Sequence, residues 1–215
     1  MLTDDVVEAI REAILNDELP AGSRLIEDDL ASMLKVSRGP VRQAIFRLQQ
    51  EGLVSHEPHR GATVVRVSAD DSEEIFSLRT ALERLSIARA CRLRTGDDLA
   101  ALRAVLDRFR ATPRAQMTRK LAAEFDIDFH DALFRAAHHT RLYQAWERVR
   151  SQVFLFLLLR DLQPAGFKDS WHKDHDDLVR LVGDRNETEA VEAITRHLGG
   201  AFDRLRAQTG GSTTQ

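Results

Sequence analysis

Apolar residues recur every three or four positions along most of this 215-residue chain, and strand-like runs stop before residue 71. This spacing predicts amphipathic helices. Helical patterns cover residues 4–16, residues 27–34 and a stretch that begins after Ser37 and ends at Gly52. Two short β-like runs follow, at residues 53–56 and 63–67, around a segment that contains Pro58 and Gly61. The fold class is therefore mainly α, with one hairpin near the N-terminus.

Beyond residue 71 the chain shows helical patterns alone. They run over residues 71–94, 97–111, 119–138, 141–161, 168–183 and 186–208, and turn residues separate them. We therefore predict an N-terminal domain of three helices and a hairpin over residues 1–67 and a linker at residues 68–71. An all-α bundle of six to seven helices follows over residues 72–208. Residues 209–215 are expected to be a disordered tail.

Composition excludes several classes of protein. Cys91 is the one cysteine, so an internal disulfide is impossible and a reducing cytoplasm is expected. The longest apolar run, residues 153–159, is far shorter than a membrane span, and the acidic N-terminus does not resemble a signal peptide. We therefore expect a cytoplasmic protein without a membrane partner. The net charge is −3, but residues 36–66 carry five arginines and two acids, a local charge of +3 that suits nucleic acid.

The predicted order of three helices and a hairpin is that of a winged helix-turn-helix, whose third helix enters the major groove of DNA. Val41, Ile45 and Leu48 give that helix one apolar face. Arg38 and Arg42 lie one turn apart on the other side, where arginine can bind guanine or phosphate. This pattern predicts a recognition helix for double-stranded DNA.

Residues at both ends of this segment support the same prediction. Ser37 is a good N-cap, and the free N–H groups of the first turn can hold a phosphate. Gly61 in the wing allows the backbone to approach the minor groove, with Arg60 beside it. Two arginines on a helix could by themselves form a charged, solvated face that binds no ligand. The cap, the wing and the local charge together favour a DNA contact.

Histidines lie on apolar faces of three predicted helices. Asp126 and His130 are four residues apart and share one face, while His175 and His197 each share a face with aliphatic residues. Each histidine can be read as a hydrogen-bonded interior residue, and the spacing leaves their convergence open. If they converge, three imidazoles and a carboxylate form a site that suits zinc, nickel, iron or manganese.

The stretch PAGSRLIEDDLASMLKVSRGPVRQAIFRLQQEGLV resembles the winged-helix domain of the GntR family of bacterial transcription regulators. The resemblance covers about residues 4–67. It implies DNA contacts at Arg38, Arg42 and the wing tip around Arg60 and Gly61, with Ser37 as cap and phosphate ligand.

Two residues depart from the family pattern near the predicted DNA surface. Lys35, which we count among the DNA-binding residues, stands in the turn where relatives usually carry glycine. A left-handed conformation there would cost about 1 kcal/mol. Gly39 stands where threonine is common, which removes one hydroxyl contact and leaves base specificity open.

The helical region, about residues 72–207, is similar to the FCD effector domain of one GntR branch. The motifs that carry this resemblance are Arg79 with Leu82-Glu83, Asp126 with Phe129-His130, Asp174-His175, and His197-Leu198. The resemblance implies that Asp126, His130, His175 and His197 bind a divalent transition metal, with zinc expected first. The roles of His138 and His139 stay open, with a helix C-cap favoured over ligation.

Arg79 has two alternative roles. Family members often use polar residues near the metal to bind a small carboxylate, and a guanidinium can bind such a ligand through two hydrogen bonds. Arg79 can equally form a salt bridge with Glu83 at i+4. We therefore include Arg79 as a candidate effector-binding residue.

These features predict a ligand-responsive transcriptional regulator, expected to be a repressor, that binds a pseudo-palindromic operator as a homodimer. A small carboxylate effector in the helical domain would shift the DNA-binding domains. One alternative is a regulator for which the metal itself is the signal. A metalloenzyme is the other alternative, but the sequence shows no further acid, base or nucleophile motif, so no enzyme activity is expected.

Overall fold

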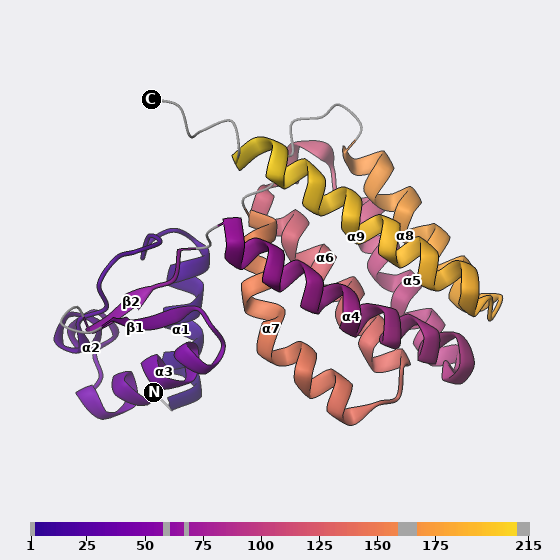
Figure 1. Cartoon of the computed structure of the whole chain (residues 1–215). Coiled ribbons are helices and arrows are strands. Elements are labelled where there is room, and N and C mark those ends of the chain that lie inside the picture. The colour runs from indigo at the N-terminus through magenta and orange to yellow at the C-terminus, as the bar shows by residue number, and fades with distance from the viewer. Residues whose placement is uncertain (1–2, 58–60, 67–68, 159–166, 210–215) are drawn as a thin grey trace. The chain divides into compact units, whose positions relative to one another are not determined.

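A computed structural model of the chain describes residues 3–57, 61–66, 69–158 and 167–209. It divides into two compact units, Met1–Ser68 with Glu147–Leu155, and Ala69–Trp146 with Phe156–Gln215. The first unit contains α1 (Thr3–Leu15), α2 (Glu27–Leu34), α3 (Arg38–Gln50), β1 (Val54–Glu57) and β2 (Gly61–Val64), and Figure 1 shows their order. We call these five elements the winged-helix unit.

Helix α3 is held in the winged-helix unit by its apolar face. Val41, Ala44, Ile45 and Leu48 are buried, and they pack against Val6 and other apolar residues of α1. Burial of each large aliphatic side chain contributes about 1.5–3 kcal/mol, so this face fixes which side of α3 stays exposed. The predicted apolar stripe of the third helix is confirmed.

Strands β1 and β2 form the antiparallel hairpin expected after the three helices. Val54 pairs with Val64 and Glu57 pairs with Gly61. The second strand therefore lies at Gly61–Val64 and not at residues 63–67, because pairing continues to the end of β1 and leaves only residues 58–60 between the strands. Gly61 has a φ of 76°, a conformation that favours glycine.

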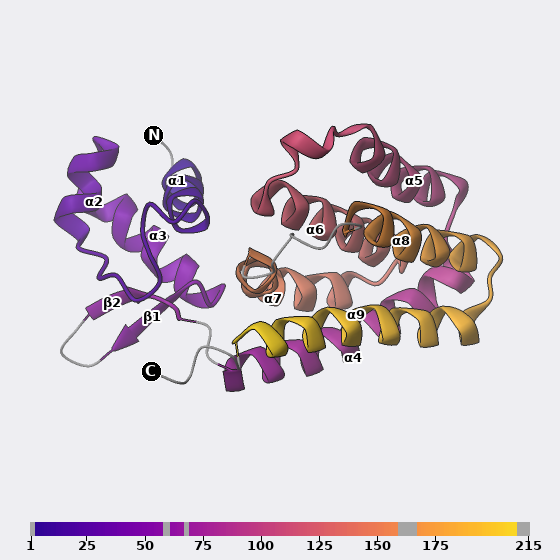
Figure 2. The ribbon, with the colours of Figure 1, turned by 90° about the horizontal axis from the view of Figure 1, so that it is seen from above.

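The second unit contains α4 (Ala69–Leu93), α5 (Gly96–Ala111), a short 3-10 turn (Arg114–Gln116), α6 (Arg119–Ala136), α8 (Phe167–Gly183), α9 (Glu187–Thr209) and the ends of α7 (Thr140–Leu158). We call it the helical unit. Helices α4 and α9 lie side by side, as Figures 1 and 2 show from two directions. None of the helices in the described ranges has the length and apolar character that crossing a membrane requires.

The core of the helical unit is aromatic and aliphatic. Phe109 of α5 stacks on Trp171 of α8 with ring centroids 3.8 Å apart, and Phe129 of α6 packs edge-on against Trp171. Thr95 begins α5 with a capping box in which Thr95 and Asp98 bond to each other's backbone N–H groups. These contacts fix the inner faces of α5, α6 and α8.

The turn between α2 and α3 places Lys35 in a left-handed conformation. Its φ is 55° and its ψ is 43°, and its N–H bonds to carbonyls of the last turn of α2. The sequence predicted a cost there if the turn required this conformation, and the structure shows that it does. The side chain is exposed, so no packing offsets the backbone cost.

Replacing Lys35 by glycine should therefore stabilise the winged-helix unit. We expect the Lys35→Gly variant to gain about 1 kcal/mol in the free energy of unfolding, because glycine adopts this conformation without a Cβ clash. Lys35→Ala is the matched control, since it removes the same side chain and keeps the clash. Urea unfolding followed by circular dichroism checks this, and equal stability of the two variants would contradict it.

Candidate functional site

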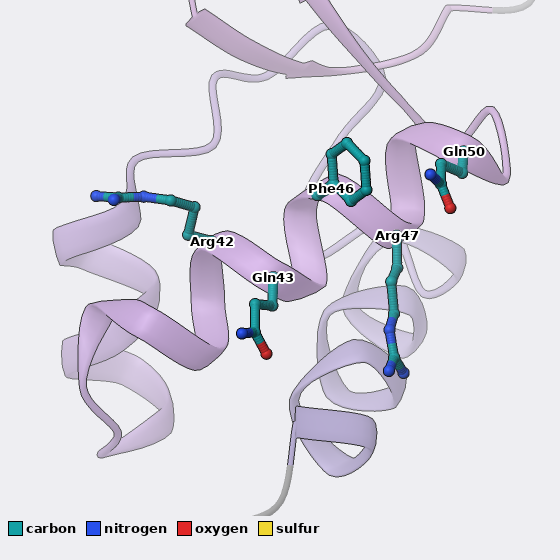
Figure 3. Close-up of a pocket in the computed structure, with 5 residues that line it drawn as sticks. All are labelled: Arg42, Gln43, Phe46, Arg47 and Gln50. Carbon is teal, nitrogen blue, oxygen red and sulfur yellow. The ribbon is translucent and has the colours of Figure 1, made fainter.

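The exposed face of α3 presents the residues predicted to bind DNA. Arg38 and Arg42 have 64% and 71% of their side-chain surface exposed, and both lie opposite the buried face. Figure 3 shows Arg42 extending from α3 towards α2. The structure therefore places both arginines where a large ligand can reach them.

Each arginine pairs with an acid in the first turn of α2. Arg38 contacts Asp28, and Arg42 donates to both carboxylate oxygens of Glu27 at 2.9–3.3 Å. The hydrogen bond from Arg42 lowers the pKa of Glu27. Exposed ion pairs of this kind contribute at most about 1 kcal/mol, so a phosphate can displace the carboxylates at little cost.

The remaining predicted DNA contacts surround these arginines. Ser37 occupies the N-cap position of α3, but within the described residues its hydroxyl makes no capping bond to the helix. Ser37 therefore stands at the predicted N-cap position, but its side chain does not cap the helix. Lys35 is exposed in the preceding turn, and Gly61 borders the same groove as Arg42. Arg60 lies outside the described residues.

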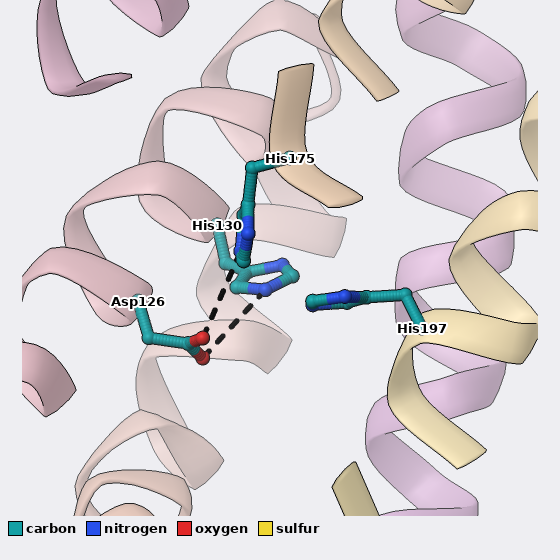
Figure 4. Close-up of side chains that lie close together, drawn as sticks. All are labelled: Asp126, His130, His175 and His197. Carbon is teal, nitrogen blue, oxygen red and sulfur yellow. Dashed lines mark ion pairs between the residues drawn. The ribbon is translucent and has the colours of Figure 1, made fainter. Parts of the chain in front are cut away.

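A second candidate site lies inside the helical unit. Asp126 and His130 come from α6, His175 from α8 and His197 from α9, and one ligand atom from each lies within 4.8 Å of the others. Figure 4 shows the four side chains converging from their helices. The Nε2 atoms of His130 and His175 are each 3.7 Å from an oxygen of Asp126. We call these four residues the Asp/His cluster, and the structure brings together the whole predicted set.

Partners outside the cluster orient its ligand atoms. The Nδ1 atom of His175 bonds to the backbone oxygen of Trp171 at 2.7 Å, and Nδ1 of His130 lies 2.5 Å from Glu83. The Trp171 indole donates to Asp126 at 3.1 Å. The sequence prediction missed these roles of Trp171 and Glu83, although the i, i+4 spacing of Trp171 and His175 places both on one face. With its Nδ1 bonded to Trp171, His175 turns Nε2 inward, as metal-binding histidines do, while His130 has the Glu83 carboxylate beside its Nδ1.

The cluster has the properties of a cation site. Among the described residues, the Nε2 atoms of His130 and His175 are buried and have no hydrogen-bond partner. Four ligands at about 2.1 Å from one ion lie about 3.4 Å apart, close to the separations found here. Burial lowers the pKa of His175 well below its usual range and also lowers the pKa of His197. Both imidazoles are therefore neutral near pH 7, the form that binds a metal.

Arg79 makes the predicted salt bridge and also reaches the cluster. Its Nε donates to Glu83 at 2.7 Å, and a terminal nitrogen donates to Asp126 at 3.2 Å. All three side chains are at least 95% buried. Burial alone raises the pKa of Glu83, but the hydrogen-bonding neighbours Arg79 and His130 outweigh it and lower the pKa, so the carboxylate stays ionised. The buried carboxylate of Asp126 beside the neutral imidazoles of His175 and His197 favours a bound cation.

Histidines at the end of α6 have other partners. His138 adopts a left-handed conformation, and its ring bonds to Asp98 at 2.8 Å. The ring of His139 accepts a bond from the backbone of Leu142. His138 therefore has a structural role at the C-terminus of α6, as expected, whereas His139 bonds to the first turn of α7. Asp128 points away from the cluster and pairs with Arg108.

Removing Arg79 should destabilise the helical unit strongly. We expect Arg79→Leu to lower the free energy of unfolding by about 3–5 kcal/mol, because it leaves Glu83 and Asp126 buried without their cation. Arg84→Leu is the control, since Arg84 is an exposed arginine of the same helix. Thermal and urea unfolding of metal-free protein measure both. A loss below 1 kcal/mol for Arg79→Leu would show that the buried network does not support the fold.

Comparison with known proteins identifies both units. The model of the gntR family of bacterial regulatory proteins matches residues 2–64, and the FCD domain model matches residues 74–200. The chain is 26% identical over 194 residues to the Nta operon transcriptional regulator of Aminobacter aminovorans, covering 90% of each chain. It is 24% identical over 150 residues to the gluconate operon transcriptional repressor of Bacillus licheniformis, covering 70% of this chain and 61% of that one.

A solved structure gives the same result. A crystal structure described as that of a GntR transcriptional regulator from Rhodococcus sp. RHA1 superposes with a TM-score of 0.79 at 25% identity, covering 95% of this chain and 97% of that one. The family and these relatives are regulators of transcription and not enzymes. The chain therefore belongs to the gntR family of bacterial regulatory proteins, as a DNA-binding transcriptional regulator with a C-terminal FCD domain.

Proposed function

We propose that this regulator is a metal-containing repressor whose FCD domain binds a small carboxylate. The convergence of Asp126, His130, His175 and His197, with buried and unpartnered imidazole nitrogens, is the observation that carries the proposal. Zinc is the first candidate because three imidazoles and one carboxylate match its preferred ligands, while nickel, manganese and iron also accept this set. A bound ion would supply a positive charge to which a carboxylate can bind.

The DNA contacts that we propose are Lys35, Ser37, Arg38, Arg42, Arg60 and Gly61. The exposure of the two arginines on α3 supports this set, as does the position of Gly61 beside Arg42. A regulator that binds chromosomal DNA works in the bacterial cytoplasm, where we place it. The relative named as a gluconate operon repressor supports repression as the direction of control.

A homodimer on a pseudo-palindromic operator follows from the size of one winged helix, which buries too little surface for tight specific binding. Exposed leucines on α4 support an association of the helical units. Leu78 and Leu85 are seven residues apart on one face and are each 47% exposed. A second copy of the chain would cover such a stripe.

A carboxylate effector is supported by Arg79 and by the relatives. Arg79 lies one hydrogen bond from Asp126, so its guanidinium is next to the cluster at which we propose that a carboxylate binds. One relative is named after the gluconate operon, and gluconate is a small carboxylate. An effector that binds one conformation of the helical unit more tightly would shift the regulator between states, and such coupling typically amounts to about 1–3 kcal/mol.

The Arg42→Ala variant tests the DNA surface. Because Arg42 is exposed, we expect its loss to leave the fold intact and to weaken operator binding by at least tenfold, the cost of one good base or phosphate contact. Gel-shift titration at fixed salt measures the affinity. Arg103→Ala controls for a general loss of charge, since Arg103 is an exposed arginine of α5. Unchanged affinity of Arg42→Ala would remove α3 from the DNA contact.

The variant His130→Ala with His175→Ala tests the Asp/His cluster. We expect it to retain less than a tenth of the metal of the parent protein, because half of the ligands are gone. Elemental analysis of both proteins measures the content. His172→Ala is the control, since His172 lies on the same helix as His175 but outside the cluster. Full metal content in the double variant would refute the ligand set.

The same preparations separate an effector-responsive regulator from a metal sensor. If the carboxylate is the signal, citrate or gluconate added to the metal-loaded protein should change operator affinity by about 5- to 150-fold. The double variant should not respond. If removal of the metal changes the affinity while carboxylates have no effect, the metal is the signal.

A further inference from the structure

We propose that Phe46 contacts the C5 methyl group of a thymine in the major groove and so contributes to operator specificity. This inference rests on the proposed DNA contact of α3. Phe46 is uncharged, so the charge pattern of α3 does not point to it. The base that it would recognise is thymine.

Phe46 is exposed on the face of α3 that the fold leaves free. It is 59% exposed, more than any other large apolar side chain in the described part of the chain. Its neighbour Ile45 is only 8% exposed, so α3 separates an inner apolar face from this outer ring. A ring this exposed contributes little to the packing of its own unit, and with the exposed Ile26 of the adjoining groove it forms an apolar surface that a partner can cover.

The residues around Phe46 show what kind of partner fits. The hollow beside the ring is lined by two arginines, two glutamines and Phe46, without an acid among the described residues that border it: Arg42, Gln43, Phe46, Arg47 and Gln50. Figure 3 shows Phe46 on the hairpin side of α3, while Gln43 and Arg47 extend the other way, towards α1. On that side Arg47 pairs with Asp4. The hairpin side therefore combines an aromatic ring with Arg42, an arrangement complementary to a negatively charged and partly apolar surface.

A groove runs from Phe46 to the hairpin. Its volume is about 420 Å³, and it lies between α3, the start of α2 and the two strands. Its lining includes the predicted DNA contacts Arg42 and Gly61, together with Ile26, which is 44% exposed. Glu27, the one acid among the described residues that line it, is bonded to Arg42. Phe46 thus lies between two parts of the structure that are expected to contact the same duplex.

Duplex DNA offers one apolar group that suits such a ring. The major groove exposes the C5 methyl of thymine, while the other base edges present hydrogen-bond donors and acceptors. Arginine can form hydrogen bonds with guanine, and glutamine can form them with adenine. The outer face of α3 therefore carries side chains that can contact several kinds of base. Phe46 follows Arg42 by one helical turn, about 6 Å along the axis, so a base contact by Arg42 brings Phe46 to a nearby base pair.

A second copy of this chain is the other partner that could cover Phe46. Association of two copies through this face would cover the arginines that we propose to bind the operator, whereas a DNA phosphate can displace the exposed carboxylates that hold them. The observations therefore favour DNA, and association of the chains becomes an outcome of the test.

The experiment begins with the full chain and a pool of random duplexes, from which the operator is selected. Each thymine of that operator is then replaced singly by deoxyuridine, which pairs identically but lacks the methyl group. For the parent protein we expect one thymine in each half-site at which this change weakens binding about fourfold, the effect of removing one buried methyl group. For Phe46→Ala we expect no further loss at that thymine and unchanged responses at the others.

Controls distinguish the possible failures. Met33→Ala removes an apolar side chain of α2 that is 53% exposed, and it should keep the thymine response of the parent. If Phe46→Ala responds to every deoxyuridine as the parent does, or if it dissociates the protein in analytical ultracentrifugation, the thymine contact is refuted. If Arg42→Ala also binds the operator with full affinity, the proposed recognition helix fails as a whole. If Arg42→Ala loses operator affinity while Phe46→Ala still responds to deoxyuridine as the parent does, only the thymine contact of Phe46 is refuted.

Discussion

The buried contact between Arg79 and Asp126 joins α4 to α6, and the candidate site depends on it. A carboxylate at 1% exposure loses its hydration, so its charge persists only beside a cation or strong donors. Arg79 holds one oxygen of Asp126 and the Trp171 indole holds the other. The same arginine bonds Glu83, which lies against His130. A single guanidinium thus orients both residues that α6 contributes to the cluster.

Helix α8 contributes through a different interaction. The backbone oxygen of Trp171 accepts the Nδ1 bond of His175, and the two rings stack with centroids 3.8 Å apart. Trp171 also stacks on Phe109 of α5. The orientation of one proposed ligand is therefore set by the aromatic core, and a ligand that moved α8 would disturb packing as well as coordination. Under the proposed function, this coupling would let ligand binding change the shape of the helical unit.

The sequence predicted the helices well because their apolar periodicity is strong and their ends carry clear turn residues. It also predicted Asp126, His130, His175 and His197, since the spacing and the family resemblance pointed to the same positions. It could not show that they converge, because convergence depends on how three helices pack. The bond from Arg79 to Asp126 spans 47 residues, and the bond from Trp171 to the same carboxylate spans 45, so no local pattern reveals either. The predicted bounds of the second strand, residues 63–67, were wrong, because strand pairing and not side-chain alternation decides where β2 begins and ends.

The acids at the start of α2 affect how strongly salt should weaken DNA binding by the arginines of α3. Arg38 and Arg42 already contact Asp28 and Glu27, so their charges are balanced within the protein before DNA arrives. If these arginines bind DNA as proposed, binding exchanges a carboxylate for a phosphate, and the freed acids attract cations from solution. Fewer ions are released in total than the number of arginine–phosphate contacts implies. The affinity of this regulator for DNA should therefore fall less steeply with salt than its arginine count suggests.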